Sequence, residues 1–137
     1  MSSKQVRIML VDDHRMVRES IALLLSSDPR FSIIKECDNG REAIEQALKL
    51  KPDVILLDIN MYPVNGFEVA EKVLKKNPSI KIIALSVNNQ ESYVSKMMSL
   101  GAKGYITKGS AYEEISRAIL AVSAGENYLS PDIRGFL

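Results

Sequence analysis

Two hydrophobic patterns alternate along nearly the whole chain. Short runs of aliphatic and β-branched residues predict five strands, at Val6–Val11, Phe31–Cys37, Asp53–Asp58, Ile80–Leu85 and Lys103–Thr107. Each run is followed by a stretch in which apolar residues recur every three or four positions, which is typical of an amphipathic helix. These helices are expected at His14–Leu25, Arg41–Leu50, Phe67–Lys76, Gln90–Leu100 and Ala111–Ala124.

Five consecutive strand–helix units predict a parallel sheet, because parallel neighbours need a long and usually helical crossover between them. We therefore expect an α/β fold: a five-stranded parallel sheet, doubly wound as (βα)5, in a flavodoxin-like three-layer sandwich. The repeat predicts one domain over residues 1–125. Residues 126–137 show no clear periodicity, and we expect a surface strap or the start of a linker there.

Polar residues suited to chemistry follow four of the expected strands. They are Asp12 and Asp13 after the first strand, Asp58 at the end of the third, Ser86 after the fourth and Lys108 after the fifth. The carboxyl ends of the strands in a doubly wound sheet share one edge, and such folds bind their ligands there. The sequence thus predicts that three acids, a hydroxyl and an ammonium group meet at this edge.

Three crowded carboxylates repel one another unless a bound cation or a raised pKa relieves the repulsion. Oxygen ligands without His or Cys favour a hard cation, and Mg²⁺ suits them because it takes one or two carboxylates and keeps its waters. Together with Mg²⁺, Lys108 and Ser86 would hold a phosphoryl group. Asp58 stands alone at the end of the most apolar strand, which makes it the best candidate for a nucleophile that forms an aspartyl phosphate.

The bulk composition of the 137-residue chain argues against several other classes. Its formal net charge is +1 and no basic stripe stands out, so there is no footprint for nucleic acid. No apolar run approaches ~18 residues and the N-terminus lacks a signal-peptide core, so no membrane association is expected. With Cys37 as the single cysteine, no internal disulfide is possible, and a cytoplasmic location is expected. The turn after the first strand is acidic rather than glycine-rich, which disfavours a dinucleotide site.

The set resembles the receiver domain of two-component response regulators, and the residues that carry the likeness are Asp12-Asp13, Asp58, Ser86 and Lys108, at these intervals on five strand–helix units. The resemblance implies that Asp58 accepts a phosphoryl group from a sensor histidine kinase. It also implies that Asp13 and Asp58 bind Mg²⁺ directly, that Asn60 adds its backbone carbonyl and that Asp12 acts through water. Lys108 would contact the phosphoryl oxygens.

The same resemblance implies a switch and a set of tuning positions. Ser86 and Tyr105 are similar to the switch pair of receivers, in which the hydroxyl moves to the phosphate and the aromatic ring follows inward. Asn60, Val87 and Asn88 occupy positions that tune the pocket. Most receivers carry a small residue where this chain has Val87, and we expect its stiff, branched side chain to narrow access to Asp58.

Further stretches resemble the NarL/FixJ-type regulators, namely Asp58-Ile59-Asn60-Met61, Asn65-Gly66, Gly101-Ala102-Lys103-Gly104-Tyr105, Lys108-Gly109 and Gly125-Glu126-Asn127-Tyr128-Leu129-Ser130-Pro131. Such proteins usually continue into a helix-turn-helix domain that binds DNA. Residues 126–137 would then be either a C-terminal tail or a truncated linker toward a missing DNA-binding domain. Homodimerisation on phosphorylation is expected through the first and last helices or through the fourth helix and fifth strand.

Other interpretations compete with a phosphorylated signalling domain. A Mg²⁺-dependent phosphatase usually has a second acid two residues beyond its nucleophile, and Asn60 at that position argues against it. A degenerate receiver that binds partners without phosphorylation is disfavoured by the complete set of acids, hydroxyl and lysine. Asp13 is also a plausible N-cap for the first helix, Tyr105 suits a static core, and His14 is expected to be an exposed first-turn residue rather than a metal ligand.

Overall fold

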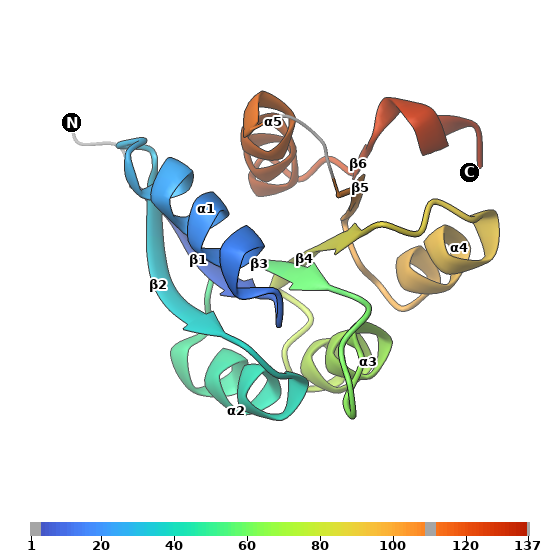
Figure 1. Ribbon diagram of the computed structural model, residues 1–137, viewed down its shortest axis with the longest axis horizontal. Coiled ribbons are helices and arrows are strands. Elements are labelled where there is room, and N and C mark those ends of the chain that lie inside the picture. The colour runs from blue at the N-terminus through green and yellow to red at the C-terminus, as the bar shows by residue number, and fades with distance from the viewer. Residues whose placement is uncertain (1–3, 109–111, 137) are drawn as a thin grey trace.

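The structure is a computed structural model that describes residues 4–108 and 112–136, and its centre is a twisted parallel sheet (Figure 1). Its strands are β1 Val6–Val11, β2 Phe31–Cys37, β3 Val54–Asp58, β4 Lys81–Ser86, β5 Gly104–Thr107 and β6 Tyr128–Leu129. They lie in the order β2-β1-β3-β4-β5-β6, and every neighbouring pair is parallel. The order reverses between β1 and β3, which is where such sheets bind their ligands.

Helices cover both faces of the sheet (Figure 1). They are α1 Arg15–Ser26, α2 Gly40–Leu50, α3 Gly66–Lys76, α4 Glu91–Ser99 and α5 Tyr112–Ser123, with the 3-10 helix η1 at Pro131–Phe136. Leu25 of α1 and Ile119 of α5 are buried in one core cluster, whereas Val73 of α3 and Met97 of α4 are buried in the other. Residues of β3 alternate between the two clusters because successive strand side chains point to opposite faces. The three-layer sandwich expected from the sequence is therefore confirmed.

All five expected strands and helices are present, and their described boundaries lie within one residue of the expected ones. The expected start of the last helix at Ala111, like Gly109, lies outside the described residues. The expected cap of the first helix is wrong. The N-cap of α1 is His14, which makes no side-chain capping bond, while the carboxylate of Asp12 accepts the His14 backbone N–H at 2.8 Å. Asp13 is left pointing partly into solvent.

A sixth strand corrects the expectation of a five-stranded sheet. The tail after α5 pairs with the outer edge of β5: the N–H of Tyr128 donates to Lys103 O and that of Ser130 donates to Tyr105 O. Ile133 of η1 is fully buried in the cluster on the α4 side. A two-residue strand is too short to show a period of two, and its pairing depends on an edge that only the folded sheet presents. The tail therefore forms a strap along the outer edge of β5.

The helices that follow β2 and β3 begin at well-formed caps. The side chain of Asn39 accepts the Glu42 N–H at 2.8 Å, and the side chain of Asn65 accepts the Glu68 N–H at 3.0 Å. Such caps satisfy a backbone donor that the first helical turn leaves without a partner. None of the helices in the described part of the chain has the length and apolar character that a membrane crossing requires.

Candidate functional site

Acidic side chains meet at the carboxyl ends of β1 and β3, beside the reversal in strand order. Asp12, Asp13, His14 and Asp58 each place one ligand-type atom within 4.8 Å of the others, and we call these four residues the acid pocket. Lys108, at the end of β5, reaches toward it: Nζ lies 3.0 Å from Asp12 Oδ2 and 3.5 Å from Asp58 Oδ2. The structure thus brings together the acids and the ammonium group that the sequence placed at this edge.

The backbone around Asp58 holds this side chain in place. All five residues of β3 are buried, so the strand delivers a carboxylate that is itself only 1% exposed. The Asn60 N–H donates to Asp58 Oδ1 at 3.1 Å, and the Gly66 N–H donates to Ile59 O at 2.9 Å. A Cβ at Gly66 would lie 2.6 Å from Ile59 Cα and 2.7 Å from Asp58 O. Gly66 therefore allows α3 to begin directly against the chain that carries Asp58.

Burial and a neighbouring charge shape the protonation of Asp58. Desolvation and, next, the carboxylate of Asp12 raise the pKa of Asp58 to about 6, against the opposing effect of Lys108. Asp58 Oδ2 and Asp12 Oδ2 are buried and accept no hydrogen bond from the described residues. Lys108 Nζ is close enough to Asp12 Oδ2 for an ion pair, but the two groups are not oriented for a hydrogen bond. The pocket therefore holds more negative charge than the described side chains compensate.

Ser86 and Tyr105 lie beside the acid pocket on β4 and β5. Ser86 is fully buried; its Oγ accepts the Asn88 N–H at 3.0 Å and lies 3.5 Å from Asn60 Nδ2. Tyr105 is also fully buried, and its hydroxyl donates to the backbone O of Asn88 at 2.6 Å. The loop that follows Ser86 is thus connected both to the hydroxyl and to the aromatic ring, and the ring already points inward.

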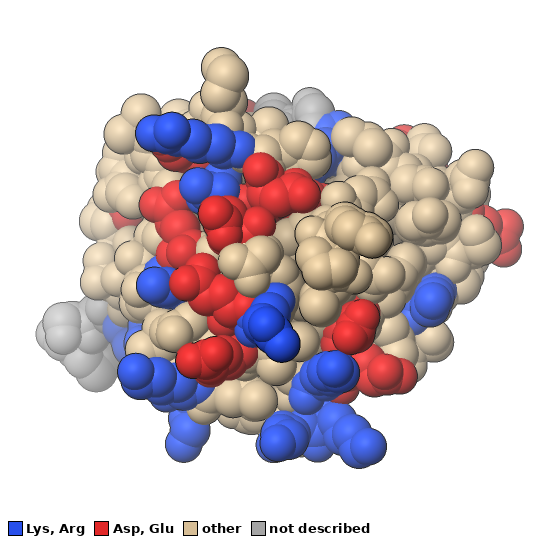
Figure 2. Space-filling view, turned by 60° about the horizontal axis from the view of Figure 1, so that its bottom comes forward, with Lys and Arg blue, Asp and Glu red and all other residues tan. Residues whose placement is uncertain are grey.

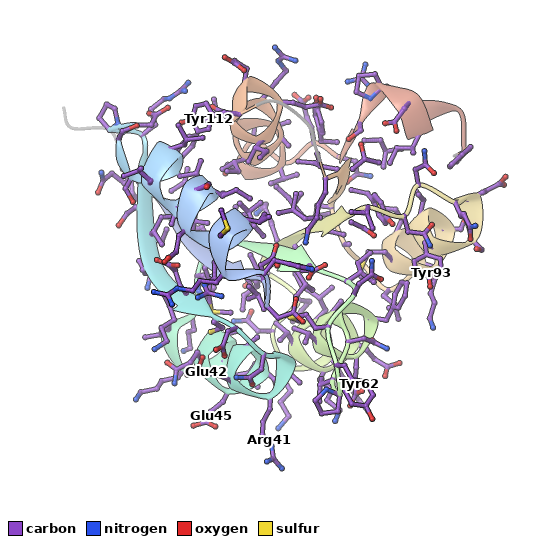
Figure 3. All side chains as sticks on the ribbon, in the orientation of Figure 1. Arg41, Glu42, Glu45, Tyr62, Tyr93 and Tyr112 are labelled. Carbon is purple, nitrogen blue, oxygen red and sulfur yellow. The ribbon has the colours of Figure 1, made fainter. Side chains whose placement is uncertain are left out.

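The remaining tuning positions are at the surface. Val87 is 72% exposed, and Asn60 is exposed as well. Tyr62, four residues beyond Asp58, is 90% exposed, precedes a cis peptide bond to Pro63, and points away from the molecule at the lower edge of Figure 3. These side chains are therefore available to molecules that approach the pocket from outside.

His14 is the residue whose position the sequence did not predict. Its side chain is 57% exposed, as a first-turn residue should be, yet its Nδ1 faces the acids at 2.9 Å from Asp12 Oδ1, 3.2 Å from Asp13 Oδ1 and 3.5 Å from Asp58 Oδ2. Adjacency to two acids was the only signal in the sequence. The direction of the ring depends on how the turn after β1 folds.

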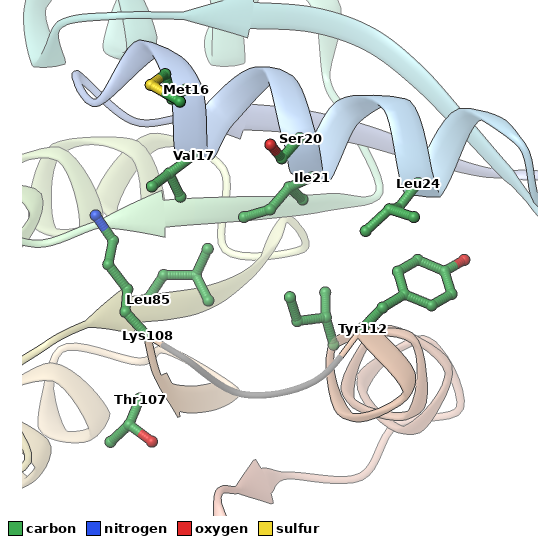
Figure 4. Close-up of a pocket in the computed structure, with 10 residues that line it drawn as sticks. Met16, Val17, Ser20, Ile21, Leu24, Leu85, Thr107, Lys108 and Tyr112 are labelled. Atoms are coloured by element: carbon green, nitrogen blue, oxygen red, sulfur yellow. The ribbon is translucent and has the colours of Figure 1, made fainter.

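An apolar groove adjoins the acid pocket between α1 and α5 (Figure 4). Its volume is about 420 Å³, and the residues that line it are Met16, Val17, Ser20, Ile21, Leu24, Leu85, Thr107, Lys108, Tyr112 and Ile115. Met16 is 84% exposed and Leu24 47% exposed, which is unusual for large apolar side chains on one helix. Lys108 reaches from the groove toward the acids, so the two features share a border.

Charge on the surface is distributed unevenly. Acidic side chains gather in a band across one face, with basic side chains among them and at the margins of the band (Figure 2). The formal net charge of +1 hides this segregation, because local potential depends on where charges lie rather than on their sum.

The donor set fits a hard divalent cation. Three carboxylates converge, and two of them, Asp12 and Asp58, are buried in a poorly screened environment. Each of these two has an Oδ2 that accepts no hydrogen bond from the described residues. An ion bound there would relieve the repulsion between Asp12 and Asp58. Oxygen ligands of this kind are those that Mg²⁺ prefers.

Comparisons with known proteins agree with the geometry. The family model described as "Response regulator receiver domain" matches residues 8–120. The response regulator GacA of Pseudomonas viridiflava is 37% identical over 93% of this chain and 60% of its own length. The nitrate/nitrite response regulator protein NarL of Escherichia coli K12 is 40% identical over 90% of this chain and 57% of its own length. The chain thus spans about 60% of the length of these relatives.

Solved structures give the same result. A two-component response regulator of the LuxR family from Aurantimonas sp. SI85-9A1 superposes with a TM-score of 0.92 at 30% identity, covering 96% of this chain and 94% of that one. The signal receiver domain of a response regulator NarL from Mycobacterium tuberculosis superposes with a TM-score of 0.87 at 30% identity, over 90% of this chain and all of that one. The chain therefore belongs to the family of response regulator receiver domains, and within it to the NarL/FixJ type.

Proposed function

We propose that this domain accepts a phosphoryl group on Asp58, with Mg²⁺ bound in the acid pocket, and that phosphorylation switches its surface to control an output. The observation that carries the proposal is a buried carboxylate whose Oδ2 accepts no hydrogen bond from any residue that the structure describes and lies 3.5 Å from the ammonium of Lys108. A buried acid in this state is poised to react or to bind a cation. Membership of the receiver family supports the same role.

The residues of the pocket have distinct parts in the proposed reaction. Asp58 Oδ2 would attack the phosphorus while the bond to the donor's leaving nitrogen or oxygen breaks and the leaving group departs with its electron pair. The Asn60 N–H keeps Asp58 Oδ1 in place, so the free oxygen faces the pocket. Lys108 would stabilise the phosphoryl oxygens, and Asp12 and Asp13 would hold the cation. Mg²⁺ bound there would supply positive charge for the oxygens of the transferred group.

The proposed switch runs through Ser86 and Tyr105. When a phosphoryl group is present, the Ser86 hydroxyl would donate to it and give up its contact with the Asn88 N–H, which now lies 3.0 Å away. Tyr105 holds the same loop through the carbonyl of Asn88, and its backbone carbonyl holds Ser130 of the strap. A movement of the Ser86 hydroxyl would therefore alter the hydrogen bonds both of the loop before α4 and of the tail.

We infer that the partners are a sensor histidine kinase and a second copy of the domain. The apolar groove between α1 and α5 supports this inference, because it borders the pocket that the donor must reach. The edge of β5 carries the strap, which makes the groove the better candidate for the dimer surface. DNA would be bound through a further domain, as the name of one relative, the transcriptional regulatory protein DegU of Brevibacillus brevis, suggests, and the expected location is the cytoplasm.

The proposed activity is that of a signalling domain rather than an enzyme with an external substrate. Asn60 stands two residues beyond Asp58, and an amide cannot protonate a leaving group as a phosphatase requires. The reactions proposed are therefore only the gain and loss of the domain's own phosphoryl group.

The test is incubation with Mg²⁺ and a small acyl phosphate, followed by intact-mass measurement, with Asp58→Asn in parallel. We expect the wild type to gain one phosphoryl group and the variant none, because an amide is not a nucleophile here. Omitting Mg²⁺ should abolish most of the gain. Equal labelling of both proteins would place the acceptor elsewhere, and labelling of neither would favour a degenerate receiver.

A further inference from the structure

His14 places one ring nitrogen among the acids of the acid pocket although 57% of its side chain is exposed. Its Nδ1 is surrounded by Asp12 Oδ1 at 2.9 Å, Asp13 Oδ1 at 3.2 Å and Asp58 Oδ2 at 3.5 Å. On another side, Lys108 Nζ lies 3.0 Å from the same nitrogen. Three acceptors and one donor therefore converge on a single atom.

One nitrogen cannot satisfy these neighbours. A ring nitrogen carries either one hydrogen or one lone pair. If Nδ1 carries a hydrogen, it can donate to one carboxylate, but it then faces the hydrogens of the Lys108 ammonium. If Nδ1 carries a lone pair, it accepts from Lys108, but it then faces three negatively charged oxygens. A cation between the nitrogen and the carboxylates removes the conflict, because the lone pair and the carboxylates then point at the same positive charge.

We propose that His14 Nδ1 is a ligand of the pocket's metal, and that it makes the site bind first-row transition dications such as Mn²⁺, Co²⁺ and Zn²⁺ in competition with Mg²⁺. This inference rests on the proposed cation site and extends it to the class of ion. Imidazole nitrogen suits transition metals, whereas Mg²⁺ takes oxygen ligands. One nitrogen and three carboxylate oxygens, all within 4.8 Å of one another, form the mixed set that these ions accept.

Two further features support the assignment. Asp58 Oδ2 is buried, lies 3.5 Å from His14 Nδ1 and accepts no hydrogen bond from the described residues, so the ligand set is short of positive charge on the side that His14 faces. The turn is also fixed in the required direction, because the His14 N–H donates to Asp12 Oδ1 at 2.8 Å and Arg18 Nη1 donates to Asp12 O at 2.7 Å. The ring hydrogen would then sit on Nε2.

The chain is well suited to a direct test, because His14 is its single histidine. In protein without a histidine tag, any imidazole nitrogen coupled to a bound metal must belong to it. We would load the wild type with Mn²⁺ and look for nitrogen hyperfine coupling by pulsed electron paramagnetic resonance. Calorimetric titrations with Co²⁺ and Mg²⁺ would give the ratio of the two affinities for the wild type, for His14→Phe, which keeps a ring but removes both nitrogens, and for Asp58→Asn.

We expect nitrogen coupling in the wild type and none in His14→Phe. The ratio of Co²⁺ to Mg²⁺ affinity should fall by about tenfold or more in His14→Phe, while Asp58→Asn should weaken both ions. Bound Mn²⁺ without nitrogen coupling, or an unchanged ratio in His14→Phe, would overturn the role of His14 and leave the proposed phosphoacceptor intact. Failure of the wild type to bind any of these ions would overturn the inference and the proposed cation site together.

Discussion

At the scale of single residues, the molecule is organised around the charge of Asp58. This carboxylate is only 1% exposed, and it lies against a second buried acid, Asp12. Removing such a charge from water is costly unless it is compensated, and the described neighbours compensate it incompletely. The buried charge therefore makes the folded domain less stable, and it leaves a site that is reactive and able to bind a cation.

Asp58→Asn should consequently stabilise the protein in the absence of metal. Because the folded-state pKa of about 6 lies above the ordinary 3.8, the ionised carboxylate opposes folding above pH 6, and protonation removes this penalty as the pH falls toward 4. We expect the free energy of unfolding of the variant to exceed that of the wild type by about 1–3 kcal/mol at pH 7.5 with EDTA. The difference should shrink at pH 4.5.

Denaturant unfolding at the two pH values measures this difference. Asp38→Asn, which removes a solvent-exposed acid, is the matched control and should change stability little at either pH. A less stable Asp58→Asn protein, or a gain that does not depend on pH, would contradict the explanation.

We expect Val87 to slow the phosphorylation of Asp58 by small donors or the hydrolysis of its phosphoryl group. Its side chain is exposed immediately after the buried Ser86, and a β-branched residue has few rotamers with which to move aside. Val87→Ala should therefore be phosphorylated faster by a small donor or lose its phosphoryl group faster to water. Stopped-flow phosphorylation and the decay of the intact-mass signal measure the two steps, and unchanged rates for both would rule the idea out.

At the scale of elements, the site depends on how closely secondary structures approach one another. The start of α3 lies against the backbone that follows Asp58, and the space at Gly66 is too small for a methyl group. The strap makes a similar approach at β5, where Ser130 Oγ accepts the Thr107 N–H at 3.0 Å. The contact at Gly66 is made by backbone atoms, so it cannot be relieved by a change of rotamer.

Gly66→Ala should for this reason affect stability and chemistry together. A Cβ 2.6 Å from Ile59 Cα must displace either α3 or the segment that carries Asp58. We expect a loss of about 1–3 kcal/mol of stability, measured by denaturant unfolding, and slower labelling by the acyl phosphate. Gly135→Ala is the control, since no atom of the described residues lies within 4 Å of its Cβ position, and it should change neither property. A variant at position 66 with normal stability would show that the approach is looser than the structure indicates.

At the scale of the whole molecule, the two sides of the sheet differ in how completely they are covered. On the α4 side, η1 buries Ile133 against the core, whereas on the other side α1 leaves Met16, Leu23 and Leu24 exposed. Exposed large apolar side chains that border a groove are typical of a surface covered by a partner. The asymmetry connects the site to the proposed homodimer, since Lys108 belongs to both the pocket and the groove.

Phosphorylation should thus raise the molar mass of the domain from monomer to dimer, measured by size-exclusion chromatography with light scattering. Met16→Glu places a charge on a side chain that is 84% exposed, so it should prevent the dimer without unfolding the protein. Lys49→Glu on α2, also an exposed position, should leave it intact. Dimerisation that survives Met16→Glu would move the interface away from the groove.

The sequence by itself determined the order and type of the ten main elements and the residues that end four strands at one edge. These follow from the hydrophobic periodicity and from the helical crossovers between parallel strands, and both can be recognised in short stretches of the sequence. Only the tertiary structure decided the sixth strand and the direction of His14. A two-residue strand has no period of its own, and the ring of His14 acquires three carboxylate neighbours only after β1 and β3 lie side by side. Close contacts between segments distant in sequence are decided by packing, which no local pattern records.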